Sequence, residues 1–177
     1  YVFSVDGPEG HGESFNRSAR VGDPYALAMA HGQHSSIVID PDATNRWFQG
    51  WTDQGFKAPA LEDMLIYEMH IRDFTSDASS GVPADLRGKY DGLVATLGTG
   101  TGLDHPKWLG VNAIELMPIC EFENRPGGYD WGYGPVCYFS PEASYASAPF
   151  KGEFYEFKQL VNDLHELGYA VSIDVVY

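Results

Sequence analysis

The stretch EFYEFKQLVNDLHELGYAVSIDVVY, residues 153–177, contains a helix signal followed by a strand signal. Within residues 153–167 the apolar side chains recur at the spacing of one helix face. They are Phe154, Phe157, Leu160, Val161, Leu164 and Leu167. Acidic residues occupy the first turn and Gly168 follows the last one, as at many helix ends. Residues 169–177 are rich in β-branched and aromatic types, so the stretch predicts a helix and then a strand.

Two further strand signals lie upstream of this helix. MLIYEMHIR at residues 64–72 alternates between two faces, as a half-buried strand does. VNAIELMPI at residues 111–119 is mostly apolar, which is typical of a buried strand. A short helix is expected over residues 103–109. Strands and helices in this repeated order imply an α/β fold with parallel strands and right-handed crossovers.

The connections between these elements are of unequal length. Segments 73–102 and 120–152 follow the first two strands and are long, whereas the returns into the next strands are short. Such asymmetry marks the C-terminal face of a barrel or an open α/β sheet, where ligand sites are built. The second segment is also crowded with aromatic residues, which argues against disorder. We therefore expect the functional site on this face.

The beginning of the chain differs in character from the rest. YVFSVD at residues 1–6 alternates like a strand, so the chain is expected to begin within one. Residues 26–30 form a short Ala and Met run that is compatible with one helical turn. We therefore interpret residues 1–30 as the end of a β-rich module.

The remaining residues divide into a linker and a new domain. Residues 31–60 mix Gly, Ser, Asp and Pro, and contain Trp47 and Trp51, which are expected to be exposed. The change in pattern after that segment predicts that a second domain, residues 61–177, starts there. This domain contains three predicted strands, and we expect the chain to end inside the third.

Composition excludes several classes of partner. The chain has 177 residues, of which 44% are hydrophobic, enough for a globular core. Its formal net charge of −14 opposes binding to nucleic acid or to an anionic membrane surface. No apolar run approaches the roughly 20 residues of a membrane helix. The 2 cysteines form neither a disulfide framework nor a zinc pattern and leave the compartment open, with a slight preference for the cytoplasm.

Two stretches resemble known binding motifs but lack residues that the motifs require. His165-Glu166 begins like the zinc motif H-E-x-x-H, but Tyr169 stands where the second histidine is needed. GTGTG at residues 98–102 resembles a phosphate loop, but it follows no predicted strand and lacks the third glycine. A flexible turn before a short helix accounts for it.

Asp174 and the segment YDWGYGP at residues 129–135 are the strongest candidates for a site. An ionisable side chain in an apolar strand is costly unless it is paired, so Asp174 is either a structural ion-pair partner or part of a site. Aromatic rings among glycines provide platforms for sugar rings, although the same rings could instead cap the core. His70 and Arg72 are expected on one face of the first strand, near Glu68.

Four stretches together resemble the alpha-amylase superfamily, and most of all its isoamylase, glycogen-debranching and pullulanase group. They are YEMHIRDFT at 67–75, GVNAIELMPI at 110–119, YDWGYGPVCYFSPEASYAS at 129–147 and VSIDVVY at 171–177. The resemblance implies that residues 61–177 form the N-terminal part of a (β/α)8 TIM barrel. Residues 5–29 resemble the end of the group's N-terminal β-sandwich, a starch- or glycogen-associated module.

The resemblance also implies an activity, namely retaining hydrolysis of α-1,6 branch linkages in glycogen, amylopectin or pullulan. That reaction uses two carboxyl groups about 5 Å apart. In relatives they come from later barrel strands, so the nucleophile and the acid/base are expected beyond Tyr177, and the chain alone is expected to be inactive. Pullulanases often have Asp directly after the WGY tyrosine, where this chain has Gly134.

The resemblance assigns roles to four positions in this chain. Tyr133 matches the tyrosine that stacks under the sugar at the cleavage point. Asp174 matches the aspartate that supports the sugar pocket. Glu121 and Asn124 resemble a calcium-binding loop of some isoamylases, although two oxygen ligands are too few to hold that ion. No other cofactor is implied, and the expected partner is an α-glucan.

Two alternatives stay open. A glucan-branching or trehalose-forming enzyme of the same superfamily would share these motifs. A non-catalytic carbohydrate-binding protein could use the aromatic loop alone.

Overall fold

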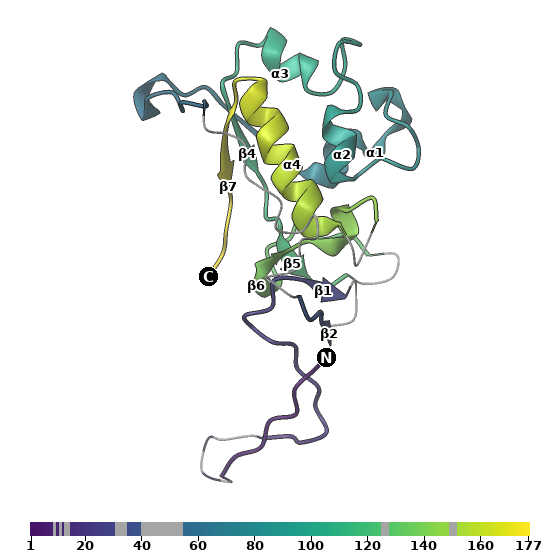
Figure 1. Ribbon diagram of the computed structural model, residues 1–177, viewed down its shortest axis with the longest axis vertical. Helices are drawn as coiled ribbons and strands as arrows, with labels where there is room; N and C mark the ends of the chain where they lie inside the picture. The colour runs from purple at the N-terminus through teal and green to yellow at the C-terminus, as the bar shows by residue number, and fades with distance from the viewer. Residues whose placement is uncertain are drawn as a thin grey trace.

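The computed structural model in Figure 1 describes most of the chain. The described residues are 1–8, 10, 12, 15–30, 35–39, 55–124, 128–148 and 152–177. Most of the linker expected at residues 31–60, with Trp47 and Trp51, lies outside them. No helix in the described part of the chain has both the length and the apolar character needed to cross a bilayer.

A three-stranded parallel sheet forms the centre of the mixed α/β structure. Its strands are β3 (Ile66–Met69), β4 (Ala113–Leu116) and β7 (Ala170–Ile173), in the order β3-β4-β7. All three coincide with predicted strands, and the predicted parallel arrangement is confirmed. Each strand is shorter than its apolar pattern suggests.

The first predicted strand is wrong at its C-terminal end. The chain leaves the sheet after Met69, and His70 is the N-cap of α1 (Ile71–Ser76). The His70 Nδ1 atom accepts a hydrogen bond of 3.2 Å from the backbone N–H of Asp73, which satisfies one free donor of the helix. His70 and Arg72 therefore do not share a strand face, because the cap changes the backbone from extended to helical.

The long α4 helix (Glu153–Glu166) confirms the predicted helix to within one residue, and α3 (Asp104–Trp108) confirms the short one. The segment 73–102 contains more helix than its polar sequence indicated. Its further elements are the 3-10 helix η3 (Ala78–Ser80) and α2 (Tyr90–Val94), and another 3-10 helix, η2 (Leu61–Asp63), precedes β3. Packing of Tyr90 and Leu93 into the core stabilises α2, which is too short to form alone.

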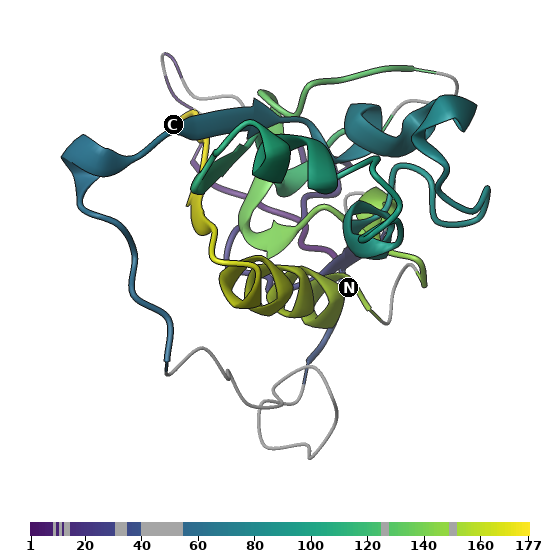
Figure 2. The same ribbon diagram turned by 90° about the horizontal axis from the view of Figure 1, so that it is seen from above.

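The core lies between one face of the sheet and the helices. Met69, Ile114 and Leu116 project from the strands into this layer, where Leu160 and Leu164 of α4 meet them. Figure 2 shows α4 running along one side of the sheet. The opposite sheet face is open in the described structure, and residues such as Ile66, 52% exposed, lie on it.

An antiparallel hairpin interrupts the segment after β4, which the sequence analysis treated as a connection. It consists of β5 (Cys120–Phe122) and β6 (Pro135–Pro141), with irregular register, and leads into the 3-10 helix η4 (Ala143–Tyr145). The loop between the two strands carries the WGY motif. The strands were missed because β5 is only 3 residues long and shows no alternation.

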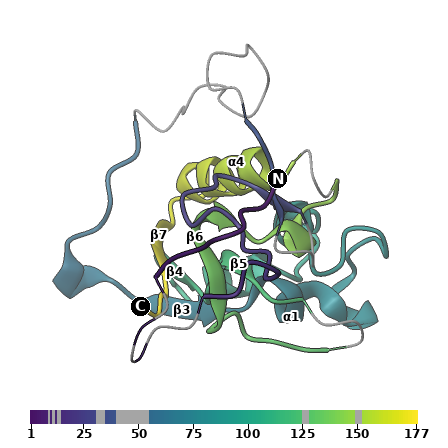
Figure 3. The same ribbon diagram turned by 90° about the horizontal axis from the view of Figure 1, so that it is seen from below.

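The N-terminal segment packs against this hairpin. The predicted helical turn at residues 26–30 is wrong, because β1 (Met29–Ala30) pairs there with β2 (Ser35–Ser36). The Cys137 thiol on β6 lies 3.2 Å from the carbonyl oxygen of Ala26. The view from below in Figure 3 shows the N-terminal segment crossing β5 and β6.

Candidate functional site

The C-terminal end of the sheet brings together the two residues that the sequence singled out. Tyr133 lies in the β5–β6 loop and Asp174 follows β7 directly. The Tyr133 hydroxyl donates a hydrogen bond of 2.5 Å to Asp174 Oδ2. The backbone N–H of Asp174 donates to the carbonyl oxygen of Leu116 at 2.9 Å, which fixes the aspartate at the end of β4. The two side chains therefore have a defined relative position.

The surroundings of Tyr133 are acidic. Its hydrogen bond to Asp174, then burial, then the charges of Asp174, Glu68 and Glu115 raise the pKa of Tyr133 to about 12. Glu68 and Glu115 occupy the same register on neighbouring strands, and both belong to the open face of the sheet. The hydroxyl therefore remains protonated at neutral pH and acts as a donor to this face.

Asp174 is half-buried, not enclosed as its apolar neighbours suggested, because β7 ends at Ile173. In the described structure it has a tyrosine as its partner and no ion pair. This arrangement differs from the structural ion pair that was one of the two predicted roles of Asp174.

Gly132 determines how closely the aromatic loop approaches the sheet. Its φ of +91° is unfavourable for other residues, and a Cβ placed there would lie 2.8 Å from the carbonyl oxygen of Pro118. Its N–H donates to Asp130 Oδ1 at 2.7 Å, which closes a tight turn before Tyr133. The glycine is thus required by both backbone angle and space.

The remaining rings of the loop are largely solvent-accessible. Tyr129 and Trp131 are 51% and 56% exposed, so in the described structure they do not form the core cap considered above. The Tyr129 hydroxyl hydrogen-bonds to Asp73, and the guanidinium of Arg72 lies 5.6 Å from the Tyr129 ring centroid. The ring is therefore held by α1 while one side faces solvent.

His70 contacts the Tyr129 and Tyr145 rings, a supporting role that was not identified from the sequence. It is 5% exposed, and its Nε2 lies 3.0 Å from the Tyr145 hydroxyl. Because Nδ1 accepts the cap hydrogen bond, the neutral ring carries its proton on Nε2 and donates it to Tyr145. Burial lowers the pKa of His70, against the opposing effect of Asp73.

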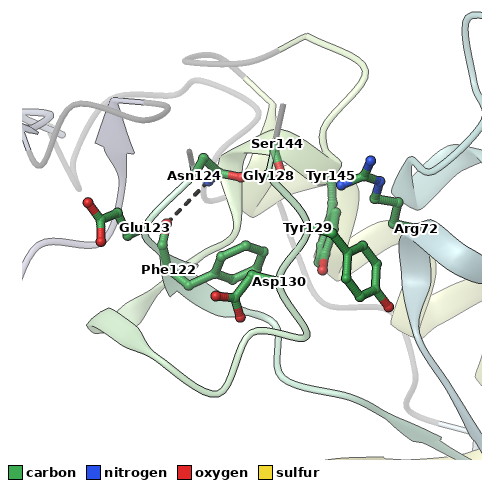
Figure 4. A pocket seen from close by; sticks show the side chains of 9 residues that line it. All are labelled: Arg72, Phe122, Glu123, Asn124, Gly128, Tyr129, Asp130, Ser144 and Tyr145. Carbon is green, nitrogen blue, oxygen red and sulfur yellow. Dashed lines mark hydrogen bonds between the residues drawn. The ribbon is translucent and has the colours of Figure 1, made fainter. Parts of the chain in front are cut away.

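A small cavity of about 170 Å³ lies beside the loop (Figure 4). It is lined by Arg72, Phe122, Glu123, Asn124, Gly128, Tyr129, Asp130, Ser144 and Tyr145. Figure 4 shows Arg72 and Tyr129 on one side of the cavity and Asn124 on the other. Its polar lining comes from both α1 and the hairpin, so the cavity depends on how the loop is held.

The residues that resemble a calcium loop are engaged with the protein itself. Glu121 is buried, and its Oε2 accepts the backbone N–H of Ala143 at 2.8 Å. The Asn124 amide donates to Glu142 Oε1 at 2.8 Å and to the Phe122 carbonyl at 3.2 Å. Within the described residues no group of three or more His, Cys, Asp or Glu side chains is placed to hold a metal ion. Glu121 and Asn124 therefore do not fit a calcium site as arranged here.

Burial and the neighbouring Glu142 carboxylate raise the pKa of Glu121 to about 9. Glu121 consequently keeps its proton at neutral pH, which limits repulsion between the two carboxyl groups. Glu142, 0% exposed, was not identified from the sequence, where it stands in SPEASY at residues 140–145 within the aromatic-rich segment.

The chain is similar to several curated proteins named as isoamylases and pullulanases. It is 35% identical over 202 residues to isoamylase 3, chloroplastic, of Oryza sativa subsp. japonica, covering 100% of this chain and 25% of that protein. It is 37% identical over 169 residues to the pullulanase of Bacillus subtilis strain 168, covering 88% of this chain and 22% of that one. The chain belongs to the alpha-amylase superfamily.

Other members of this superfamily match over similar lengths. The malto-oligosyltrehalose trehalohydrolase of Saccharolobus solfataricus is 36% identical over 161 residues, covering 90% of this chain and 23% of that protein. A pullulanase structure from Paenibacillus barengoltzii, in complex with maltohexaose and alpha-cyclodextrin, matches with a TM-score of 0.73 and 34% identity. The match covers 89% of this chain and 26% of that one. No family model matches the chain.

The chain thus spans about a quarter of the length of the curated relatives it matches.

Proposed function

We propose that this chain is the part of a debranching glycoside hydrolase that begins its catalytic barrel. The enzyme would cleave α-1,6 branch linkages of an α-glucan such as glycogen, amylopectin or pullulan. In this proposal residues 61–177 supply the first three strands of a (β/α)8 barrel, residues 31–60 a linker, and residues 1–30 the end of a β-sandwich module. The parallel order β3-β4-β7 and the pullulanase relatives support it.

The contact between Tyr133 and Asp174 is the observation that carries this function. It joins an aromatic ring and a carboxylate at the C-terminal end of parallel strands, where α/β folds bind ligands. A ring at this edge offers an apolar face to a glucose unit. The carboxylate both orients the ring and can accept a hydrogen bond from a sugar hydroxyl. Tyr133 and Asp174 are therefore proposed as substrate-binding residues.

Hydrolysis with retention needs a nucleophile and an acid/base about 5 Å apart. No residue of this chain is assigned to either role in the proposal, which places both beyond Tyr177. The role of this chain is to bind and orient the sugar. An α-glucan is its proposed partner, and no organic cofactor is required.

Activity measurements on the complete polypeptide test this proposal. It should release reducing ends from pullulan and glycogen, and Tyr133→Ala should lower kcat/KM by about 100-fold, because a misplaced sugar rarely reaches the reactive geometry. The 177-residue chain by itself should release none. Wild-type-like hydrolysis by that chain, or an unaffected Tyr133→Ala enzyme, would contradict the proposal.

A trehalose-forming activity is the second candidate, because the trehalohydrolase of S. solfataricus matches almost as well as the pullulanase. Product analysis separates the two. Linear maltooligosaccharides from a branched glucan support debranching, whereas free trehalose from a maltooligosyltrehalose supports the alternative.

A further inference from the structure

We propose that Glu142 is a positioning residue that holds the base of the aromatic loop and thereby places Tyr133. This inference rests on the proposed function, in which Tyr133 binds the sugar. Glu142 itself lies in the linkage between β6 and η4, outside the open face of the sheet. It acts through the loop and does not touch the substrate.

The Glu142 carboxylate joins both sides of the hairpin. Its Oε2 accepts the backbone N–H of Phe122 at 3.1 Å, at the last residue of β5. Its Oε1 accepts the side-chain amide of Asn124 at 2.8 Å and the backbone N–H of Ser144 at 2.7 Å. All three partners are N–H donors, the set that a carboxylate satisfies and a neutral amide cannot.

A reciprocal contact strengthens the connection. Glu121, on β5, accepts the N–H of Ala143, which directly follows Glu142. The backbone N–H of Glu142 also donates to the carbonyl oxygen of Ile119 at 2.7 Å. Each strand end thus supplies a carboxyl group to the backbone of the other, so the entry to the loop has little freedom to shift.

Two further donors hold the backbone around Glu142. The Tyr90 hydroxyl donates to its carbonyl oxygen at 3.1 Å, and Lys89 Nζ donates to the carbonyl oxygen of Ser144 at 2.6 Å. Because the side chain is 0% exposed, water cannot replace a lost partner.

The β5–β6 loop, which begins at the residues that Glu142 binds, makes further contacts closer to Tyr133. Tyr129 contacts Asp73, Gly132 lies against Pro118, and Tyr133 reaches Asp174. Glu142 holds the chain where it leaves β5, at Phe122 and Asn124, and we expect the later contacts to weaken if that departure shifts. A change at Glu142 should therefore alter sugar binding through Tyr133.

A double-mutant cycle in the complete enzyme tests the inference. The variants are Glu142→Gln, Tyr133→Ala and their combination, and the measured quantity is kcat/KM on pullulan. Glu142→Gln is expected to lower it by about 10-fold, because the new amide N–H faces a backbone or side-chain donor. The combined variant should be no worse than Tyr133→Ala, since both remove the same placement of the ring.

Glu156→Gln is the matched control. Glu156 is a similarly buried carboxylate, but it accepts from the Ser147 N–H at 2.7 Å and the Ser147 hydroxyl at 2.6 Å, away from the loop. Its effect on kcat/KM should multiply with that of Tyr133→Ala. If Glu142→Gln fails to fold, Asn124→Ala can replace it in the cycle. This substitution, at a residue that lines the cavity, removes one hydrogen-bond donor to Glu142.

The outcomes separate the inference from the function on which it depends. If Tyr133→Ala impairs hydrolysis but the losses from Glu142→Gln or Asn124→Ala multiply with it, Glu142 serves only stability and the inference is wrong. If Tyr133→Ala leaves hydrolysis intact, the proposed function and the inference both fail.

Discussion

The Tyr133 hydroxyl donates a 2.5 Å hydrogen bond to Asp174 across a sequence separation of 41 residues. This contact connects the β5–β6 loop to the end of β7 and places an aromatic ring beside the acidic open face of the sheet. A glycine-containing loop and a strand end that lie far apart in the sequence are thereby joined.

Removing the Asp174 charge should lower the pKa of Tyr133. In Asp174→Asn the main cause of the elevation is lost, so the pKa should fall from about 12 toward 10.0. Titration of tyrosine carbons by NMR, with Tyr133→Phe assigning the signal, measures this. An unchanged pKa in Asp174→Asn would show that the two side chains are not in contact in solution.

Gly132→Ala should destabilise the loop. The new Cβ would lie 2.8 Å from the Pro118 carbonyl oxygen, and the backbone φ of +91° at position 132 is strained for any L-residue. We therefore expect a loss of about 1–3 kcal/mol in the free energy of unfolding. Gly134→Ala is the matched control, because nothing lies within 4 Å of its added Cβ. Equal midpoints of urea unfolding for the two variants would contradict the assigned backbone constraint.

His70 should make stability depend on pH. Burial lowers its pKa in the folded state below the usual 6.5, so the unfolded chain binds the proton more readily. Asp73 and Asp130 oppose this shift and Arg72 supports it. The contribution of His70 is therefore complete above about pH 6.5 and is lost as the pH falls from there through the folded-state value.

His70→Asn isolates that contribution, because Asn retains an acceptor for the N-cap of α1 but does not titrate. Between pH 7.5 and 5 the free energy of unfolding should fall more steeply in the wild type than in His70→Asn. Glu121 has the opposite effect, because its raised pKa makes stability decrease as the pH rises toward about 9. Subtracting the unfolding free energy of His70→Asn from that of the wild type removes the Glu121 effect, which both proteins share. Parallel curves would rule out a titrating His70.

Leu164→Ala should leave a cavity beneath the sheet. Leu164 is 0% exposed and contributes to the core between α4 and the strands, so a loss of about 2–5 kcal/mol is expected. Leu61, 78% exposed, provides the control, and Leu61→Ala should change stability by less than about 0.5 kcal/mol. Similar unfolding midpoints for both variants would contradict the placement of α4 on the sheet.

The spacing of apolar residues correctly predicted the helices and strands that contain a long apolar pattern. The face of Leu160 and Leu164 predicted α4, and the apolar run around Ile114 predicted β4, because burial of a continuous stripe outweighs local preferences. The short elements α1, α2, β5 and β6 were missed. Each depends on partners far away in the chain, such as the Tyr90 ring of α2 in the core or the Glu142 carboxylate at the end of β5.

By itself the sequence determined the α/β alternation and the kinship with debranching enzymes, and it singled out Tyr133 and Asp174 as candidates for a site. These are local or additive properties that survive in a one-dimensional pattern. Only the tertiary structure decided that Tyr133 meets Asp174, that Glu142 holds Phe122 and Asn124, and that Glu121 faces protein donors. Such contacts depend on sheet register and on the directions of buried hydrogen bonds, which residue spacing does not encode.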